Sequence, residues 1–465
     1  MLYALVISLA LLATGVVWQV ETRFRLVLTP MLLFMIYYVL RIVPGFVYGI
    51  EVKKIGGAYA YAVVSIVLLA AILGWATARL MWPSGGRELL SWHNTSVQRD
   101  RPVASIWVVC LAVGLLFVGL LLYRGIPPSF RPFFVLVQGG DWTEVIGAVS
   151  EGRRLLTKGH FFGGDYRGQG VMREVLFVGW SLVSCYALAR FMRLRSFRSL
   201  LVLLGSVTTS YILVSGDGTR GPFLLVFISM VATWTMACRV PPQTLALVGI
   251  VFITLGVGLG AYTPKMHGVI RSEGVGAAVG AFVERVAIGN SFNDVLAVDA
   301  VRSRQWEYGL GRWHSRDILA AFPGTLGGKP LGYYLHLTES AGATGTTYLT
   351  GTQIMTAHTD FGIWGLGVPF LIMGFVAAIG LRTITNARKT ESALALAGVS
   401  VMLLGQLYTS GLIGVAVELG VLALLAAPLF GVRHFPSLAR VQSPSPISNV
   451  GLDGSYPPNR PISKG

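Results

Sequence analysis

The sequence predicts an all-α, polytopic integral membrane protein of about eleven transmembrane helices. Of its 465 residues, 54% are hydrophobic and 12% are charged, and the mean hydropathy is +0.65. A soluble domain carries about 25% charged residues, so this chain cannot cover a globule with charge. Its apolar residues also form repeated runs of about 20 residues, the length that an α-helix needs to cross a hydrocarbon core of roughly 30 Å.

The predicted spans are residues 2–19, 26–49, 59–81, 103–123, 174–192, 197–215, 220–238, 243–261, 360–381, 392–411 and 415–431. The first run lacks a positively charged leader and an Ala-x-Ala cleavage site, which predicts a retained helix rather than a cleaved signal peptide. Arg41 in the second run and Glu418 near the start of the last would be charges inside the membrane, which are costly and mark candidate functional positions. Arg41 lies near the outer end of its run, so snorkelling to the interface can also explain it.

The orientation follows from the Lys and Arg residues of the short loops. One very short loop carries Arg190, Arg193, Arg195 and Arg198, and positively charged short loops face the cytoplasm. Every second loop then falls on the same side, and these loops also carry Arg23, Arg25, Arg79, Arg87, Arg99, Arg101, Arg239, Arg382, Arg388 and Lys389. The predicted topology has its N-terminus outside and its C-terminus in the cytoplasm.

The two longest loops, residues 124–173 and 262–359, fall on the outer side. Within the second, an amphipathic helix is predicted by apolar residues at helical spacing, namely Val279, Phe282, Val283, Val286 and Ala287. The segment from Trp306 to Thr352 is rich in Gly, Thr and aromatic residues, which predicts an irregular but ordered structure. Residues 1–431 are thus predicted to form one transmembrane domain. The cytoplasmic tail, 432–465, has a Pro- and Ser-rich composition that predicts disorder.

Composition and missing motifs exclude several classes of function. A net charge of +16 would suggest nucleic acid in a soluble protein, but in a membrane protein it marks basic loops beside anionic headgroups. No nucleic-acid partner is therefore predicted. Cys110, Cys185 and Cys238 each lie in an apolar run, so neither a disulfide framework nor a metal cluster is indicated. The sequence has no Walker A, Rossmann, HExxH or Gly-x-Ser-x-Gly motif, which argues against an ATP-driven pump. No acidic pair has the spacing of a metal site, and no cofactor is predicted.

The two outer loops are rich in basic residues. The first carries Arg124, Arg131, Arg153, Arg154, Lys158, Arg167 and Arg173, and the second carries Lys265, Arg271, Arg285, Arg302, Arg304, Arg312, Arg316 and Lys329. Long loops can cross the membrane whatever their charge, so nearby acids can simply balance these cations. The alternative is a site for an anionic substrate, because Arg binds phosphate oxygens bidentately and stays charged.

Three short patches combine such residues with helix ends. In the first, Ser215-Gly-Asp-Gly-Thr-Arg220-Gly-Pro, Arg220 lies at the membrane boundary just before a helix. A helix N-terminus and an arginine together favour an anion, although Arg220 can also simply snorkel. The second patch, from Phe282 to Asp294, sets Arg285 among Asn and Asp residues. These are unfavourable in a helix and so indicate a function, with a solvated helix face as the alternative.

The third patch, Thr356-Ala-His358-Thr-Asp360-Phe-Gly362-Ile-Trp-Gly365, closes the second long loop. His358 and Asp360 lie where the chain re-enters the membrane, and either can act as a base on a bound substrate. In the structural alternative, Thr359 or Asp360 caps the following helix, and the glycines allow close helix packing.

With two large outer loops and these three patches, the sequence resembles the bacterial Wzy-type polymerases of O-antigen and exopolysaccharide repeat units. The resemblance lies in the Gly-Thr-Arg220-Gly turn, the Arg285 stretch and the Asp360-Phe-Gly-Ile-Trp-Gly365 helix entry. It implies a GT-C-like membrane glycosyltransferase of the bacterial inner membrane. Its substrate would be an oligosaccharide linked to undecaprenyl diphosphate on the periplasmic face. The growing chain would be transferred from its lipid diphosphate to the next lipid-linked repeat unit.

The resemblance also implies roles for individual residues. The residues expected to bind the diphosphate are Arg220, Arg285, Arg271, Arg173 and Arg154, and Arg285 would also take part in catalysis. His358 or Asp360 would take the proton of the attacking hydroxyl. A metal is not required, because a neutralised diphosphate is a good leaving group. Besides membrane lipids, the implied partners are the flippase and the chain-length regulator of the same pathway.

Two other functions stay open. An O-antigen ligase, which transfers finished polymer to lipid A-core, also pairs a periplasmic arginine with a histidine, and His358 fits that role. A non-enzymatic polysaccharide transporter is a third class. The absence of internal repeats, the lopsided placement of the large loop and the scarcity of polar residues in mid-helix argue against it.

Overall fold

The structure, a computed structural model, is almost entirely helical. The residues that it describes are 2–23, 25–53, 56–83, 85–123, 127, 130–141, 143–145, 147–148, 169–215, 221–241, 243–244, 247–251, 254, 264–284, 288, 290–303, 306–320 and 352–430. Among these residues there is no β-strand, and one isolated bridge joins Gln98 to Thr390.

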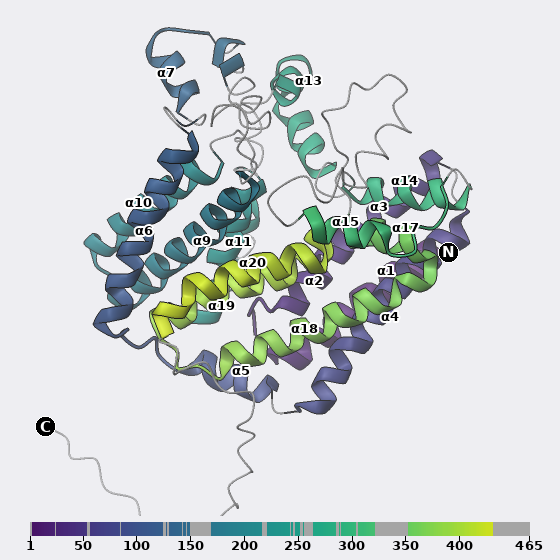
Figure 1. The fold of residues 1–465 in the computed structure, drawn as a ribbon, viewed down its shortest axis with the longest axis horizontal. Helices are drawn as coiled ribbons and strands as arrows, with labels where there is room; N and C mark the ends of the chain where they lie inside the picture. The colour runs from purple at the N-terminus through teal and green to yellow at the C-terminus, as the bar shows by residue number, and fades with distance from the viewer. Residues whose placement is uncertain are drawn as a thin grey trace, which may run out of the picture.

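The helices shown in Figure 1 are α1 (Leu2–Thr22), α2 (Pro30–Tyr37), the π-helical turn η1 (Tyr38–Ile42), α3 (Val43–Lys53), α4 (Gly57–Met81), α5 (Gly85–Asn94), α6 (Pro102–Tyr123), α7 (Arg131–Val137), α9 (Gln169–Leu194), α10 (Phe197–Val214), α11 (Gly221–Ala237), α13 (Pro264–Glu284), α14 (Asn290–Arg302), α15 (Arg312–Ala320), α17 (Gln353–Gly365), α18 (Gly367–Thr385), α19 (Glu391–Gly405) and α20 (Leu407–Phe430).

Six spans within the described residues are long and apolar enough to cross a membrane. They are Ala4–Thr22, Pro30–Glu51, Gly57–Met81, Pro102–Tyr123, Met172–Leu194 and Phe197–Val214. The bent pair of α17 and α18 makes a seventh if it is counted as one span. These helices confirm the prediction of an all-α membrane protein with several membrane-spanning helices.

The predicted number of eleven spans is not confirmed by these helices. Three further predicted spans correspond to apolar helices of 10–17 residues, Gly221–Ala237, Glu391–Gly405 and Gly414–Leu429. Such helices are shorter than the roughly 20 residues that a crossing needs. The remaining predicted span, 243–261, lies largely outside the described residues.

Helices α4 and α18 pack backbone against backbone. A Cβ atom added at Gly74 would lie 1.9 Å from the carbonyl oxygen of Leu371, and one added at Gly374 would lie 1.9 Å from that of Ala71. The two contacts are reciprocal, so the two glycines together remove the bulk that would separate the helices. This crossing fixes α18, and with it the preceding helix α17, against the N-terminal part of the chain.

Helix α14 is held on α3 in the same way. A Cβ atom at Gly45 would lie 2.3 Å from Cβ of Ser291, and one at Gly49 would lie 2.4 Å from a methyl group of Val295. The two glycines are four residues apart and therefore lie on one face of α3. The contact brings Asp294, between the two α14 residues, next to the bundle.

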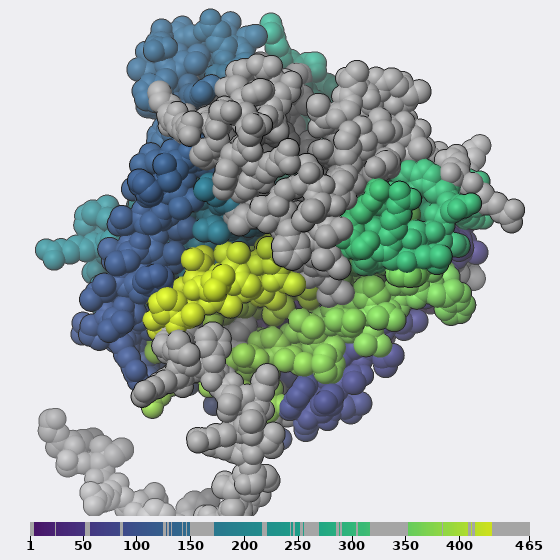
Figure 2. Space-filling view, in the orientation of Figure 1, coloured from purple at the N-terminus to yellow at the C-terminus, as the bar shows by residue number. Residues whose placement is uncertain are grey.

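The predicted span 360–381 is not one straight helix. α17 ends at Gly365 and α18 starts at Gly367, and the two helices are bent by 110°. Inside α17, Gly362 has φ 65° and ψ −156°, a conformation that residues with a side chain rarely adopt. The glycines of this patch therefore turn the chain. α18 then runs beside α20 on the face shown in Figure 2.

The prediction that Thr359 or Asp360 caps the helix at this point is wrong. α17 begins at Gln353, and its N-cap is Thr352, whose hydroxyl accepts a hydrogen bond from the Ile354 amide at 3.1 Å. Thr359 and Asp360 lie in the middle of α17 and are fully buried.

The second long loop contains more helix than the sequence predicts. α15 (Arg312–Ala320) lies within the segment that was expected to be irregular. A helix, α13, covers the start of the predicted amphipathic stretch, and Phe282 is buried there in a cluster with Ala278 and Leu224. Val283 of the predicted apolar face is exposed, and Val286 and Ala287 lie outside the described residues. α13 ends at Glu284, so Asn290 and Asp294 belong to the separate helix α14.

The short loops that the sequence groups on one side meet at one end of the bundle. Lys389 Nζ donates to the carbonyl oxygens of His93 at 2.8 Å and Ala237 at 3.3 Å. Arg193 forms an ion pair with Glu391 at 2.6 Å. These contacts join the ends of α5, α9 and α11 to the start of α19, opposite α13 (Figure 1). The grouping agrees with the alternation of basic loops, and the side that this end faces stays a prediction.

Candidate functional site

Asp360 and His314 form the central contact of the candidate site. Oδ2 of Asp360 lies 2.5 Å from Nδ1 of His314, although the two residues are 46 positions apart in the sequence. Asp360, on α17, is fully buried, whereas the His314 side chain, on α15, is 24% exposed. A carboxylate in this position holds the imidazole in the tautomer that carries its proton on Nδ1.

The same carboxylate explains why α15 forms. Oδ1 of Asp360 accepts a hydrogen bond from the Trp313 amide at 3.0 Å, and Oδ2 accepts one from the His314 amide at 2.9 Å. These first-turn amides have no partner within their own helix, and an N-cap side chain normally satisfies them. Gly309 makes room for the carboxylate, because a Cβ atom there would lie 2.2 Å from Oδ1. Asp360 thus caps a helix from another part of the chain.

The second nitrogen of His314 faces the start of α17. Nε2 of His314 lies 2.9 Å from Nε2 of Gln353. With the proton of His314 on Nδ1, Nε2 is an acceptor and the Gln353 amide is the donor. His314 is therefore oriented at both ring nitrogens, by Asp360 on one side and Gln353 on the other.

Arginine and tryptophan side chains surround this pair. The guanidinium carbons of Arg316 and Arg312 lie 4.9 Å and 5.7 Å from the Trp313 ring centre. Trp313 itself stacks on Trp306 with 6.0 Å between ring centres. Cation–π contacts hold both cations beside His314, so an anion and a flat apolar surface can be bound next to the same imidazole.

His358, two residues before Asp360, contacts different partners. Its Nε2 lies 2.7 Å from the hydroxyl of Tyr59, and Arg302 lies over the same tyrosine ring at 5.3 Å. His358 is fully buried, and its Nδ1 has no hydrogen-bond partner among the described residues. The structure thus places His358 at a histidine–tyrosine–arginine contact and not beside His314.

Asp294 joins α14 to the N-terminus of α17. Its two carboxylate oxygens accept hydrogen bonds from the Thr352 amide at 2.6 Å and the Thr352 hydroxyl at 2.8 Å. Burial raises the pKa of the Asp294 carboxyl to about 7, although these hydrogen bonds and the positive charge of Arg41 oppose the rise. Asp294 is therefore a titratable group in the neutral range.

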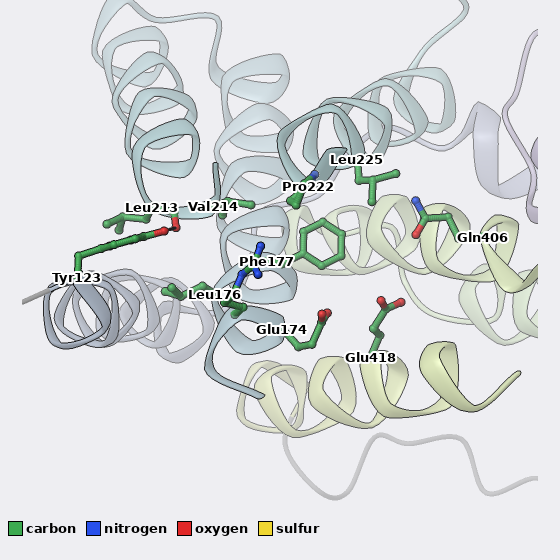
Figure 3. Close-up of a pocket in the computed structure, with 11 residues that line it drawn as sticks. Tyr123, Glu174, Leu176, Phe177, Leu213, Val214, Pro222, Leu225, Gln406 and Glu418 are labelled. Carbon is green, nitrogen blue, oxygen red and sulfur yellow. Dashed lines mark hydrogen bonds between the residues drawn. The ribbon is translucent and has the colours of Figure 1, made fainter. Parts of the chain in front are cut away.

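A cavity of about 230 Å³ lies between the ends of α6, α9, α10, α11 and α19 and the middle of α20 (Figure 3). Its polar lining is Arg173, Glu174, Gln406 and Glu418, and the rest is mainly apolar. Glu174 and Glu418 extend toward one another (Figure 3). Glu418 is buried, and its Oε2 has no hydrogen-bond partner in the described part of the chain.

Further polar groups lie near Gln406 of the cavity and near Asp294. Gln406 hydrogen-bonds to Tyr37, and Arg41 interacts electrostatically with both Tyr37 and Asp294. Arg41 lies in η1, and single π-helical turns are frequent at functional sites. The positive charge of Arg41 thus acts on Tyr37 and Asp294, while its buried Nε has no hydrogen-bond partner among the described residues.

The predicted diphosphate ligands are only partly described. Arg173 lines the cavity, and Arg271 is exposed on α13. Arg154, Arg220 and Arg285 lie outside the described residues. Val214 and Pro222, which flank the segment 216–220, both line the cavity.

Sequence reasoning missed His314, Gln353 and Tyr59. A signal was present for His314, which follows Trp313 between two arginines in a segment predicted to be irregular. Gln353 and Tyr59 carry no local signal, because their roles depend on contacts with residues 39 and 299 positions away. In the described residues, no group of three or more His, Cys, Asp or Glu side chains is arranged to hold a metal ion.

Comparison of the chain with protein-family models, with curated proteins and with solved structures gives no match.

Proposed function

We propose that this chain is a bacterial inner-membrane glycosyltransferase that polymerises oligosaccharide repeat units carried on undecaprenyl diphosphate. In this proposal it has eleven spans and a GT-C-like architecture, and it acts at the periplasmic face. The observation that carries the proposal is the Asp360–His314 pair, which lies beside Arg312 and Arg316. The pair is at the same end of the helix bundle as the cavity that Arg173 lines.

The placement of these elements at one end follows from the helices that carry them. Arg173 and Arg193 are at opposite ends of α9, and Arg193 pairs with Glu391 at the end of the basic short loops. α18 likewise ends at that side, where Arg382 lies 4.0 Å from Glu88. α17, which precedes α18, therefore lies at the same end as Arg173. A lipid-linked substrate could reach both from the bilayer.

In the proposed reaction, His314 takes the proton of the attacking hydroxyl. The acceptor oxygen forms the new glycosidic bond, the bond from the sugar to the lipid diphosphate breaks, and the diphosphate leaves with the electron pair. Asp360 keeps the proton of His314 on Nδ1, so the lone pair of Nε2 is available once the Gln353 amide turns aside. Arginines neutralise the leaving diphosphate. This step requires a positioned acceptor hydroxyl and neutralisation of the leaving diphosphate. In the proposal, His314 and the arginines provide these.

His314 suits the role of base better than the two residues that the sequence suggested. Asp360 and His358 are fully buried, and the oxygens of Asp360 are occupied by Trp313 and His314. A base must come within hydrogen-bond reach of the proton that it removes. In this proposal Asp360 positions His314, and His358 supports Tyr59.

The proposed partners are the lipid-linked oligosaccharide, the surrounding lipids, and a flippase and a chain-length regulator of the same pathway. One observation favours the ligase alternative. Tyr59 contacts both His358 and Arg302, so an arginine and a histidine share one tyrosine outside the proposed polymerase dyad.

The polysaccharide of a deletion strain separates these functions. A polymerase is expected to leave surface lipopolysaccharide or capsule with one repeat unit and no long chains, and the wild-type gene should restore the ladder. Finished polymer that accumulates unattached on its lipid carrier would instead show a ligase. Loss of both the single repeat and the long chains would show a translocation defect.

A further inference from the structure

A second cavity, of about 410 Å³, lies at the opposite end of the bundle from His314. It is formed by the end of α1, the last turns of α4 and the start of α5, and its lining includes Val20, Arg23, Trp75, Arg79, Leu80 and Arg87. Three arginines and a tryptophan therefore share one cavity, and the function proposed above does not use it.

The charge of this cavity is only partly balanced. Arg79 is paired at 2.9 Å with the buried carboxylate of Glu21, which also accepts hydrogen bonds from Trp75 Nε1, at 2.9 Å, and from the Thr29 hydroxyl. Arg23 and Arg87 are exposed, and among the described residues neither has an acidic partner. Within the described part of the chain, the cavity thus has two arginines without an acidic partner beside a third, Arg79, that is paired with Glu21.

Arg23 occupies a position that does not suit its residue type. Its φ of 48° directly after α1 is a left-handed conformation that favours Gly or Asn. Arginine disfavours this backbone conformation, but its side chain places a guanidinium at the rim of the cavity.

The cavity opens onto apolar surfaces of α1 and α4. On α1, Leu9, Leu12 and Val16 are exposed at helical spacing and lead to Val20 in the cavity wall. On α4, Leu69 and Leu73 are exposed in the same way and lead to Leu80. These side chains belong to two of the spans long enough to cross the membrane. A ligand in the cavity can therefore have a charged head and long apolar chains.

We propose that this cavity binds the headgroup of an anionic phospholipid, whose acyl chains lie along α1 and α4. Arginine forks bind phosphate oxygens bidentately, tryptophan prefers the headgroup level of the bilayer, and basic pockets between helices bind polyanionic lipid heads. Two free arginines beside a fixed third match a headgroup with two phosphates, so cardiolipin is the best-fitting occupant. The proposal does not depend on the glycosyltransferase proposal.

The test uses the full-length protein in nanodiscs or detergent, with binding read by native mass spectrometry. Cardiolipin is expected to bind more tightly than phosphatidylglycerol, and phosphatidylcholine only weakly. Either single replacement, R23Q or R87Q, should weaken cardiolipin binding by roughly fivefold. The double variant should weaken binding by the product of the two single factors. The matched control is R99Q/R101Q, which removes two exposed arginines of the same group of loops that do not line the cavity.

Thermal unfolding of each variant without added lipid checks that the fold is retained. R23K/R87K keeps the charge without the planar fork and should retain part of the affinity. Equal loss in R99Q/R101Q and R23Q/R87Q would overturn the site, since binding would then follow total charge. Binding of phosphatidylcholine as tight as that of cardiolipin would overturn it too. Competition by millimolar inorganic phosphate that removes cardiolipin completely would show an anion site without a lipid component.

Discussion

The three titratable side chains of the candidate site differ in their access to a substrate. His314 is partly exposed, while Asp360 and His358 are fully buried. His314→Ala is expected to lower kcat by roughly 10²–10⁴-fold, the usual contribution of a general base. Purified enzyme with lipid-linked repeat units would give kcat and KM. If His358→Ala abolishes transfer while His314→Ala leaves kcat near normal, His358 is the base and the present assignment is wrong.

Asp360→Asn separates the charge of this residue from its shape. The amide can still accept one of the two backbone hydrogen bonds, but it no longer fixes the proton on Nδ1 of His314. We expect a fall in kcat with little change in KM, a shift of the pH profile, and a stability loss of about 0.5–2 kcal/mol for the weakened cap. A loss of stability with an unchanged pH profile would show that Asp360 only caps α15.

The stability of the folded protein should depend on pH through Asp294. Its pKa is raised to about 7 in the folded protein and is near 4 in an unfolded chain. The folded state thus holds a proton that the unfolded chain releases. The stabilising contribution is complete below about pH 4 and is lost as the pH rises through about 7.

Asp294→Asn mimics the protonated form, so its advantage in Tm over wild type should widen between about pH 4 and 7 and then stay constant. Scanning fluorimetry in detergent would measure it. The control is Asp299→Asn, a less buried acid on the same helix. A Tm difference for Asp294→Asn that does not change with pH would contradict the prediction.

At the scale of elements, the crossing of α4 and α18 depends on two glycines. A methyl group at Gly74 or Gly374 would overlap a backbone carbonyl of the other helix, and backbone cannot move aside as a side-chain tip can. Gly74→Ala should therefore destabilise the protein by about 1–3 kcal/mol. Gly114→Ala on α6, where nothing lies within 4 Å of the added atom, should be neutral or slightly stabilising. Equal Tm values for both variants would show that the helices do not cross so closely.

The break between α17 and α18 shows what local patterns predict and what they miss. The apolar run of 360–381 predicts a helix because hydropathy depends on composition alone. It does not reveal the 110° bend or the left-handed conformation of Gly362 just before it. A long-range contact, the pairing of Asp360 with α15, makes a helix of Arg312–Ala320, whose Gly- and aromatic-rich surroundings predict irregular structure.

At the scale of the whole molecule, the first six membrane-spanning helices could be predicted from the sequence, whereas the shape of the later helices and the contacts of the candidate site could not. The first six apolar runs match spans within a few residues, because each must be apolar over its full length whatever it packs against. The pairing of His314 with Asp360 joins positions 46 apart, and that of Tyr59 with His358 joins positions 299 apart. No spacing rule relates such residues. The alternation of loops predicted only that His358, Asp360 and Arg173 lie at the same end of the bundle.

That alternation leads to the last prediction, on the orientation of the whole bundle. The end with Arg193, Lys389 and Glu391 should face the cytoplasm, and α15 should face the periplasm. In a variant without the three native cysteines, single cysteines would replace Arg198 and Arg312, which are both exposed. An impermeant maleimide should label position 312 in intact spheroplasts and position 198 only after permeabilisation. Labelling of position 198 but not position 312 in intact spheroplasts would invert the topology. His314 would then face the cytoplasm, where a periplasmic polymerase could not use it.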